Sequence, residues 1–242
     1  MWKNKFEITD FHSHILPGMD DGAKDLKESL KMLEKLLEEG VDKVIATSHY
    51  YQFREDVPTY VERRDRVLYN LESYIKEHDI YLPEIVPACE VRIWHGMSRD
   101  ENLSKLTVGE SKYILLEMPY DQWTDWMFAE VYSVSSRGFI PIMAHLERYV
   151  DLIPEKTIIQ KLLSLGVHVQ CNAESLKLRK SRKFMKKLIK HQRLTVLGTD
   201  CHNLDDRPPE FNYALEYISS KFGDEALEKI MTNANIIISS KR

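Results

Sequence analysis

The sequence has few of the features that place a protein outside the cell or in a membrane. Its 242 residues include only three cysteines, Cys89, Cys171 and Cys201, whose odd number and wide spacing do not suggest a disulfide framework. No apolar run approaches the roughly 18 residues that a membrane span needs. The opening residues, MWKNKFEITD, lack the apolar core of a signal peptide. We therefore expect a cytoplasmic protein with no membrane span.

A strong charge of either sign is missing as well. The 34 lysines and arginines nearly balance the 38 aspartates and glutamates, which leaves a formal net charge of −4. We therefore expect no surface for nucleic acid over the fold as a whole. The exception is the basic stretch LKLRKSRKFMKKLIK at 176–190. It is typical of a solvated helix face, and its charge also suits an anionic partner.

Repeats, low-complexity segments and flexible linkers are absent too, so nothing in the sequence divides the chain. With 43% hydrophobic and 30% charged residues, the composition is that of an ordinary globular protein. We expect residues 1–242 to form a single domain, because an α/β barrel of this length is commonly one domain.

What the sequence does contain is a regular alternation of short β-rich runs and helix-period segments. The predicted strands are 6–11, 41–47, 84–89, 113–118, 139–144, 167–172 and 194–200. The predicted helices are 25–40, 58–79, 125–138, 154–165 and 176–190, with two more that begin near Pro208 and Asp224. Such alternation indicates parallel βαβ units. We predict an α/β fold, and seven units in this length favour a closed or nearly closed barrel.

Side chains that bind metal ions stand at the carboxyl end of nearly every predicted strand. In a parallel barrel these ends meet on one rim, where active sites lie. His12 and His14 are two residues apart, so they share a face of a strand, and Asp200 and His202 repeat this spacing. Imidazoles with carboxylates suit Mn, Fe or Zn, and this many ligands predicts a cluster of two or three ions. The strand-end residues are His12, His14, His49, Glu90, Glu117, His145, Asp200 and His202.

These motifs, taken together, resemble those of the PHP (polymerase and histidinol phosphatase) superfamily. They are DFHSHILPGMDDGAKD, ATSHYY, PACEVRI, LLEMP, AHLERY and GTDCHN, in family order across residues 8 to 207. The chain looks more closely like the manganese-dependent protein-tyrosine phosphatases of bacterial capsule and exopolysaccharide operons. The resemblance implies a distorted (β/α)₇ barrel, which agrees with the seven predicted strands.

The resemblance also distributes the ligands among three ions. The ligands of the first ion would be His12, His14, Glu90 and Asp200. Glu90 would bridge to a second ion, whose other ligands would be Glu117 and His145. The third would take His49, His202 and an acid of the MDDG loop, which we match to Asp21 rather than Asp20. Asp10 would lie behind the ligands and orient an imidazole.

Two arginines complete the predicted site. Arg148 stands three residues after His145, and Arg207 stands five after His202. A guanidinium group binds two phosphoryl oxygens at once, and the family carries arginines at matching places. We therefore expect both arginines to bind the substrate phosphate and to act in catalysis.

The activity implied is metal-dependent hydrolysis of phosphotyrosine. Two or three divalent ions, manganese with iron and zinc as alternatives, would lower the pKa of water to near 7 and supply hydroxide. Hydroxide would attack phosphorus in line without a phosphoenzyme, because a phenolate with a pKa of about 10 leaves with little acid assistance. The implied substrate is the phosphotyrosine-rich tail of a membrane-associated tyrosine kinase that controls polysaccharide assembly. The basic stretch could help to steer it.

Several other interpretations stay open at this point. The stretch from Cys201 to Arg207 has the Cys-x₅-Arg spacing of cysteine-dependent phosphatases, but it has no glycine, and Asp205 and Asp206 would repel phosphate. We interpret this match as coincidence. A small-molecule phosphomonoesterase of the PHP type, such as a histidinol phosphatase, would share the ligands. An amidohydrolase fits the later ligands poorly. A non-catalytic metal-binding regulator would not need the arginine pair.

Overall fold

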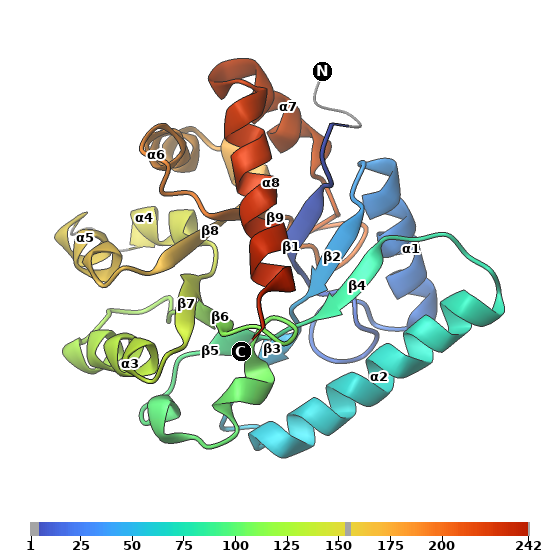
Figure 1. Cartoon of the computed structure of the whole chain (residues 1–242), viewed down its shortest axis with the longest axis horizontal. Helices are drawn as coiled ribbons and strands as arrows, with labels where there is room; N and C mark the ends of the chain where they lie inside the picture. Colours follow the sequence, from blue (N-terminus) through green and yellow to red (C-terminus); the bar gives the residue numbers. More distant parts are fainter. Residues whose placement is uncertain (1–4, 153–155, 242) are drawn as a thin grey trace.

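The chain forms nine short strands and eight α-helices over residues 5–152 and 156–241, the part that a computed structural model describes (Figure 1). The strands are β1 (Thr9–Ser13), β2 (Lys43–Ala46), β3 (His49–Tyr50), β4 (Glu84–Pro87), β5 (Glu90–Arg92), β6 (Tyr113–Glu117), β7 (Ile140–Met143), β8 (His168–Asn172) and β9 (Val196–Gly198). The helices are α1 (Leu26–Glu38), α2 (Val57–Glu77), α3 (Asp125–Ser136), α4 (Tyr149–Leu152), α5 (Lys156–Ser164), α6 (Arg179–Lys190), α7 (Asn212–Phe222) and α8 (Asp224–Ser239). Short 3₁₀ turns are η1 (Met97–Arg99), η2 (Leu103–Leu106), η3 (Leu146–Arg148) and η4 (Glu174–Lys177).

All strand pairs are parallel, and together they curl into a ring. The sheet orders are β1-β2-β4 and β3-β5-β6-β7-β8-β9. The pairs β2/β3 and β4/β5 are each one predicted strand, interrupted at 47–48 and at 88–89. A parallel bridge between Ser13, at the end of β1, and Cys201, just past β9, joins the first strand to the last. The seven predicted strands and the distorted (β/α)₇ barrel are confirmed.

A small apolar core lies directly beneath the strand ends. One buried side chain from each of six strands contributes to it, and Ala234 and Ile237 of α8 join them. In Figure 1, α8 crosses in front of the strands. Because side chains two residues apart on a strand share a face, the face of β6 that buries Leu115 in this core also carries Glu117. The barrel core therefore positions the strand-end ligands. The six strand residues are Phe11, Ile45, Val86, Leu115, Ile142 and Val196.

Helices α1 and α2 begin where the sequence supplies capping side chains. The Asp25 carboxylate accepts a hydrogen bond from the amide of Glu28 at the start of α1, and the Asp56 carboxylate does the same for Thr59 in α2. The predicted start of one helix at Pro154 lies outside the described residues. Among residues 5–152 and 156–241, no helix combines the length and apolar character needed to cross a membrane.

Candidate metal centre

The predicted metal ligands meet at the carboxyl ends of the strands. All of them except His145 form three overlapping groups, and within each group the ligand atoms lie no more than 4.8 Å apart. The first group is His12, His14, Glu90 and Asp200; the second is His49, Glu90 and Glu117; the third is His14, Asp21, His49 and His202. Because His14, His49 and Glu90 each belong to two groups, the three groups form one continuous centre.

The first group has the geometry of a metal site. His12 Nε2 lies 3.1 Å from His14 Nε2, and both nitrogens lie 3.2–3.4 Å from Glu90 Oε2 and Asp200 Oδ1. A tetrahedron with such edges has its centre about 2 Å from each corner, which is the length of zinc–nitrogen and zinc–oxygen bonds. Within the described residues, both of these buried oxygens form no hydrogen bond. The four side chains therefore fit a divalent cation.

Glu90 connects the first two groups. Its Oε2 lies 3.0 Å from His49 Nδ1, while its Oε1 lies 2.7 Å from His145 Nε2. This placement is consistent with the bridging carboxylate that we expected. His145 stands at the edge of the second group, 4.0 Å from Glu117 Oε1, and His49 joins Glu90 and Glu117 there as well as the third group. The family resemblance matches His49 to the third ion alone.

The two acids of the MDDG loop have different positions. Asp21 is exposed, and its Oδ1 lies 3.6 Å from both His49 Nε2 and His202 Nε2. Asp20 is largely buried; its Oδ2 lies 2.7 Å from His14 Nδ1 and accepts a hydrogen bond from the His49 amide. Asp21 therefore belongs to the third group of metal-binding atoms, whereas Asp20 orients the ring of His14.

Asp10 does not orient an imidazole, which corrects our expectation. Its carboxylate accepts hydrogen bonds from the backbone amides of His12 and Thr199 and from the Thr199 hydroxyl. The ring of His12 instead contacts Gln170, whose Oε1 lies 3.1 Å from His12 Nδ1. We did not single out Gln170, although a signal existed. It is a polar residue inside β8, two before Asn172, so both lie on one face of the strand.

Backbone geometry also brings the ligands together. Asp200 and His145 have positive φ angles of 57° and 31°, a conformation that non-glycine residues rarely adopt and that occurs at functional sites. β9 ends at Gly198, so Asp200 and His202 do not share a strand face as predicted; they lie in the irregular segment that follows. A Cβ atom on Gly198 would lie 2.5 Å from His12 Cβ, so glycine lets this segment approach β1.

The ionisation of Glu90, Asp200 and His202 suits metal binding. Burial opposes the charged forms of Glu90 and Asp200, but the surrounding histidines outweigh it and hold the pKa of both carboxyl groups well below the ordinary value. Burial and the charge of Glu90 raise the pKa of Glu117. Burial and the neighbouring His14 lower the pKa of His202 to about 2. A neutral imidazole and an ionised carboxylate are the forms that coordinate a metal.

The two predicted arginines converge on one atom of the centre. Arg148 Nη1 and Arg207 Nη2 each lie 2.7 Å from Asp200 Oδ2, and their side chains are 25% and 31% exposed. A third arginine, Arg92, lies 3.1 Å from Glu117 Oε2. Its position two residues after Glu90 on β5 was a signal that we did not use. The centre is thus bordered by guanidinium groups that solvent can reach.

Cys201 is poorly placed to be a nucleophile. Its side chain is buried, and burial raises the pKa of its thiol above the ordinary value. A cysteine nucleophile needs the opposite, an accessible thiol with a lowered pKa. The structure therefore supports the interpretation that the Cys-x₅-Arg spacing is coincidental. All three cysteines are buried and unpaired.

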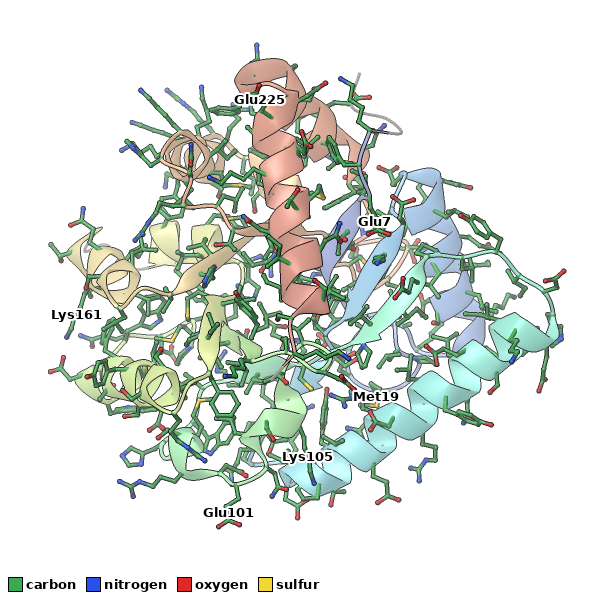
Figure 2. The ribbon with its side chains drawn as sticks, in the orientation of Figure 1. Glu7, Met19, Glu101, Lys105, Lys161 and Glu225 are labelled. Atoms are coloured by element: carbon green, nitrogen blue, oxygen red, sulfur yellow. The ribbon has the colours of Figure 1, made fainter. Side chains whose placement is uncertain are left out.

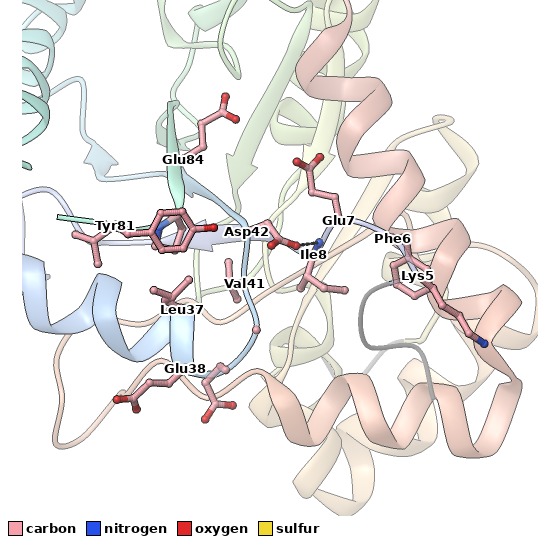
Figure 3. A pocket seen from close by; sticks show the side chains of 14 residues that line it. Lys5, Phe6, Glu7, Ile8, Leu37, Glu38, Val41, Asp42, Tyr81 and Glu84 are labelled. Atoms are coloured by element: carbon pink, nitrogen blue, oxygen red, sulfur yellow. Dashed lines mark hydrogen bonds between the residues drawn. The ribbon is translucent and has the colours of Figure 1, made fainter. Parts of the chain in front are cut away.

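A separate hollow of about 710 Å³ opens at the other end of the barrel (Figure 3). It lies beside the amino ends of β1, β2 and β4 and is bordered by Glu7, Asp42, Tyr81 and Glu84. Asp42 accepts a hydrogen bond from the Ile8 amide there. None of the residues lining this hollow is a predicted ligand or arginine, so the site that we describe is at the opposite end.

Known proteins resemble the chain along nearly its whole length. The family model for capsular polysaccharide synthesis, CpsB/CapC, matches residues 8–239. Tyrosine-protein phosphatase YwqE of Bacillus subtilis is 29% identical over 239 residues, which cover 96% of this chain and 91% of YwqE. Tyrosine-protein phosphatase CpsB of Streptococcus pneumoniae is 28% identical over 243 residues, which cover 96% and 98% of the two chains.

Solved structures agree with these sequence matches. A crystal structure from the work on YwqE and CpsB, described as unique metal-dependent tyrosine phosphatases, superposes with a TM-score of 0.86 at 27% identity and covers 97% of this chain and 96% of that one. The lactonase Lmo2620 of Listeria monocytogenes has a TM-score of 0.58 at 11% identity, with coverage of 99% and 97%, and shares the fold alone.

Proposed function

The chain belongs to the CpsB/CapC family of capsular polysaccharide synthesis, and from this membership we propose that it is a metal-dependent tyrosine-protein phosphatase. The observation that carries the proposal is one arrangement of side chains. Three groups of metal-binding atoms overlap through His14, His49 and Glu90, and two arginines meet at Asp200 beside them. We propose that residues 1–242 form the single catalytic domain.

The centre would hold two or three divalent ions in the three groups described above. Its mixed imidazole and carboxylate ligands support manganese, with iron and zinc as the alternatives. When bound, such ions would neutralise phosphoryl charge and lower the pKa of water towards neutrality. Gln170 and Asp20 hold the rings of His12 and His14 in place from behind.

The arginines would bind the phosphoryl group. Arg148 and Arg207 reach the same oxygen of Asp200, so their guanidinium groups lie side by side at the edge of the first group. Planar guanidinium groups bind phosphoryl oxygens through paired hydrogen bonds and stabilise the charge that these oxygens carry during transfer. The salt bridge between Arg148 Nη2 and Glu174 Oε1, at 3.2 Å, helps to fix one of the two.

Two tyrosine rings beside the centre favour an aromatic substrate. Tyr51 stacks on His49 with ring centroids 5.1 Å apart, and Tyr120 stacks on His145 at 6.0 Å. Tyr120 is 43% exposed, so part of its ring is available to a ligand. The phenyl ring of phosphotyrosine can pack on such surfaces, whereas a small alkyl phosphate offers no ring. The phenolate leaving group also needs little acid assistance, which suits direct hydrolysis.

The partner that we propose is a phosphotyrosine protein, the tail of a tyrosine kinase of polysaccharide assembly. The link of the family to capsular polysaccharide synthesis supports this assignment. We propose that the two proteins meet in the cytoplasm, a reducing compartment that suits three unpaired cysteines.

Relative rates on three phosphate esters test the proposal. The manganese-loaded protein should hydrolyse a phosphotyrosine peptide with a kcat/KM at least about tenfold above those for the matching phosphoserine peptide and for histidinol phosphate. Faster hydrolysis of histidinol phosphate would replace the proposal with a small-molecule phosphomonoesterase. If the protein retains manganese but hydrolyses none of the three esters, the result would favour a non-catalytic regulator.

A further inference from the structure

A second surface feature is a groove of about 560 Å³ between α5 and α6. The two helices lie next to each other on the outside of the barrel in Figure 1. The side chains at the bottom of the groove are apolar, and several of them are only partly buried. They are Val150, Ile159, Leu163, Phe184 and Leu188.

The border of this groove is basic. Helix α6 carries seven lysines and arginines and no acid, and no acid lines the groove among the side chains that the structure describes, those of residues 5–150 and 157–241. Lys183 and Lys187 of α6 are exposed and have no ion-pair partner among the side chains of residues 5–150 and 157–241. Figure 2 shows long side chains with nitrogen tips extending outward from α6. In a chain with a net charge of −4, this is a concentrated positive surface.

Two segments beside the groove connect it to Arg148. Val150 lines it and is only two residues after Arg148. At the other side, the turn η4 leads into α6, and its Glu174 forms the salt bridge with Arg148. A polypeptide bound along the groove could therefore continue into the centre.

We propose that this groove binds an acidic segment with apolar side chains, carried by the same protein whose phosphotyrosine the centre hydrolyses; the proposal rests on the function proposed above. Acidic side chains would pair with the lysines, and apolar ones would fill the floor. An anionic membrane fits less well. Amphipathic helices bind membranes with an exposed apolar face, but the apolar residues Met185 and Ile189 of α6 are buried.

Charge reversal on the border tests the proposal. Lys183→Glu/Lys187→Glu changes two exposed lysines one helical turn apart, and Lys27→Glu/Lys31→Glu on α1 makes the same change at the same spacing on another exposed face. With manganese loaded, the first variant should lower kcat/KM for a phosphotyrosine peptide with a leucine-containing acidic segment by at least about fivefold. Its rate on p-nitrophenyl phosphate should stay within about twofold of the unchanged protein, as should both rates of the control.

Equal losses on both substrates, or the same loss in the control, would overturn the groove proposal. Binding of the unphosphorylated acidic peptide, followed by fluorescence anisotropy, separates it from the proposed function. If the full chain binds this peptide and the reversal weakens binding, the groove stands even if phosphotyrosine is not hydrolysed. If the reversal weakens binding to phosphatidylserine vesicles but not to the peptide, the groove is a membrane contact and the proposal is wrong.

Discussion

At the scale of single residues, the convergence of the strand-end side chains could be predicted because each of them ends or closely follows a β-rich run. His12, His14 and Glu90 needed only the rule that parallel strands end on one rim. The residues that hold the ligands could not be found in this way. Gln170 contacts His12 across 158 positions of sequence, and Asp20 reaches the amide of His49 from 29 residues away. Such contacts depend on the completed barrel.

The arginine pair gives the first prediction at this scale. Arg207→Ala should lower kcat/KM for phosphotyrosine by about 10²-fold, because it removes a group that stabilises transferring phosphoryl oxygens. Arg207→Lys should recover only part of the loss, since an ammonium group keeps the charge without the planar pair of donors. Initial rates and the manganese content of each variant are the measurements. The exposed Arg66→Ala is the control, and an Arg207→Ala enzyme of normal rate would refute the role.

For Cys201 we predict that substitution leaves the activity nearly unchanged. Cys201→Ser should keep the rate on phosphotyrosine within about threefold of the unchanged protein, because the buried thiol is not the nucleophile. The same assay after treatment with iodoacetamide should give the same result. A near-complete loss in a variant that still folds and binds manganese would restore the cysteine mechanism.

At the scale of elements, the strands were more predictable than the places where they break. The alternation of apolar runs gave all seven strands, but not the interruption at 47–48, where the Thr47 amide bonds to the carbonyl of Ser13. The helix expected near Pro208 begins at Asn212. The carboxylate of Glu39 accepts hydrogen bonds from the Phe211 and Asn212 amides, and this partner lies at the end of a distant helix. Propensity alone cannot show such a cap.

The contact between Glu130 of α3 and a distant loop leads to a prediction about stability and pH. Its buried carboxylate accepts hydrogen bonds from the amides of Gly96 and Ser98. Burial raises its pKa, but these hydrogen bonds outweigh burial, so the pKa lies below the ordinary 4.5. A lowered carboxyl pKa contributes stability that is present above about pH 4.5 and is lost as the pH falls through the folded-state value. Glu130→Gln should therefore lower the free energy of unfolding by about 1–3 kcal/mol at pH 7.

The difference in the free energy of unfolding between the unchanged protein and Glu130→Gln should shrink as the pH falls below 4. Urea unfolding followed by circular dichroism at pH 7 and pH 3.5 measures it, with the exposed Glu62→Gln as the control. A loss of the same size at both pH values would show that charge is not the cause.

At the scale of the whole molecule, the barrel brings ligands from all parts of the chain to one end. The sequence favoured a closed barrel, and the bridge between Ser13 and Cys201 supplies the closure. Periodicity could not predict that bridge, because it joins segments 188 residues apart and depends on the irregular backbone around Asp200. The amino ends of the strands, at the opposite end, border the hollow of about 710 Å³, and none of the ligands lines it.

The dispersed ligands predict that metal stabilises the whole fold. Manganese at about 100 times its dissociation constant should raise the free energy of unfolding by about 2.7 kcal/mol, because it binds the folded chain. Glu90→Gln, which alters the side chain that connects the first two groups, should remove most of this effect. Differential scanning calorimetry with manganese and with chelator measures the effect in the unchanged protein and in the variant. An equal manganese effect in the variant would place the ion elsewhere.

The most direct test of the central claim is hydrolysis of a phosphotyrosine peptide by chelator-stripped protein before and after manganese is added back. We predict no activity in the stripped protein and full recovery with manganese, because the His, Asp and Glu side chains at the barrel rim act through bound ions. Activity that survives complete stripping, with metal content checked by atomic emission, would contradict the account and direct attention back to Cys201.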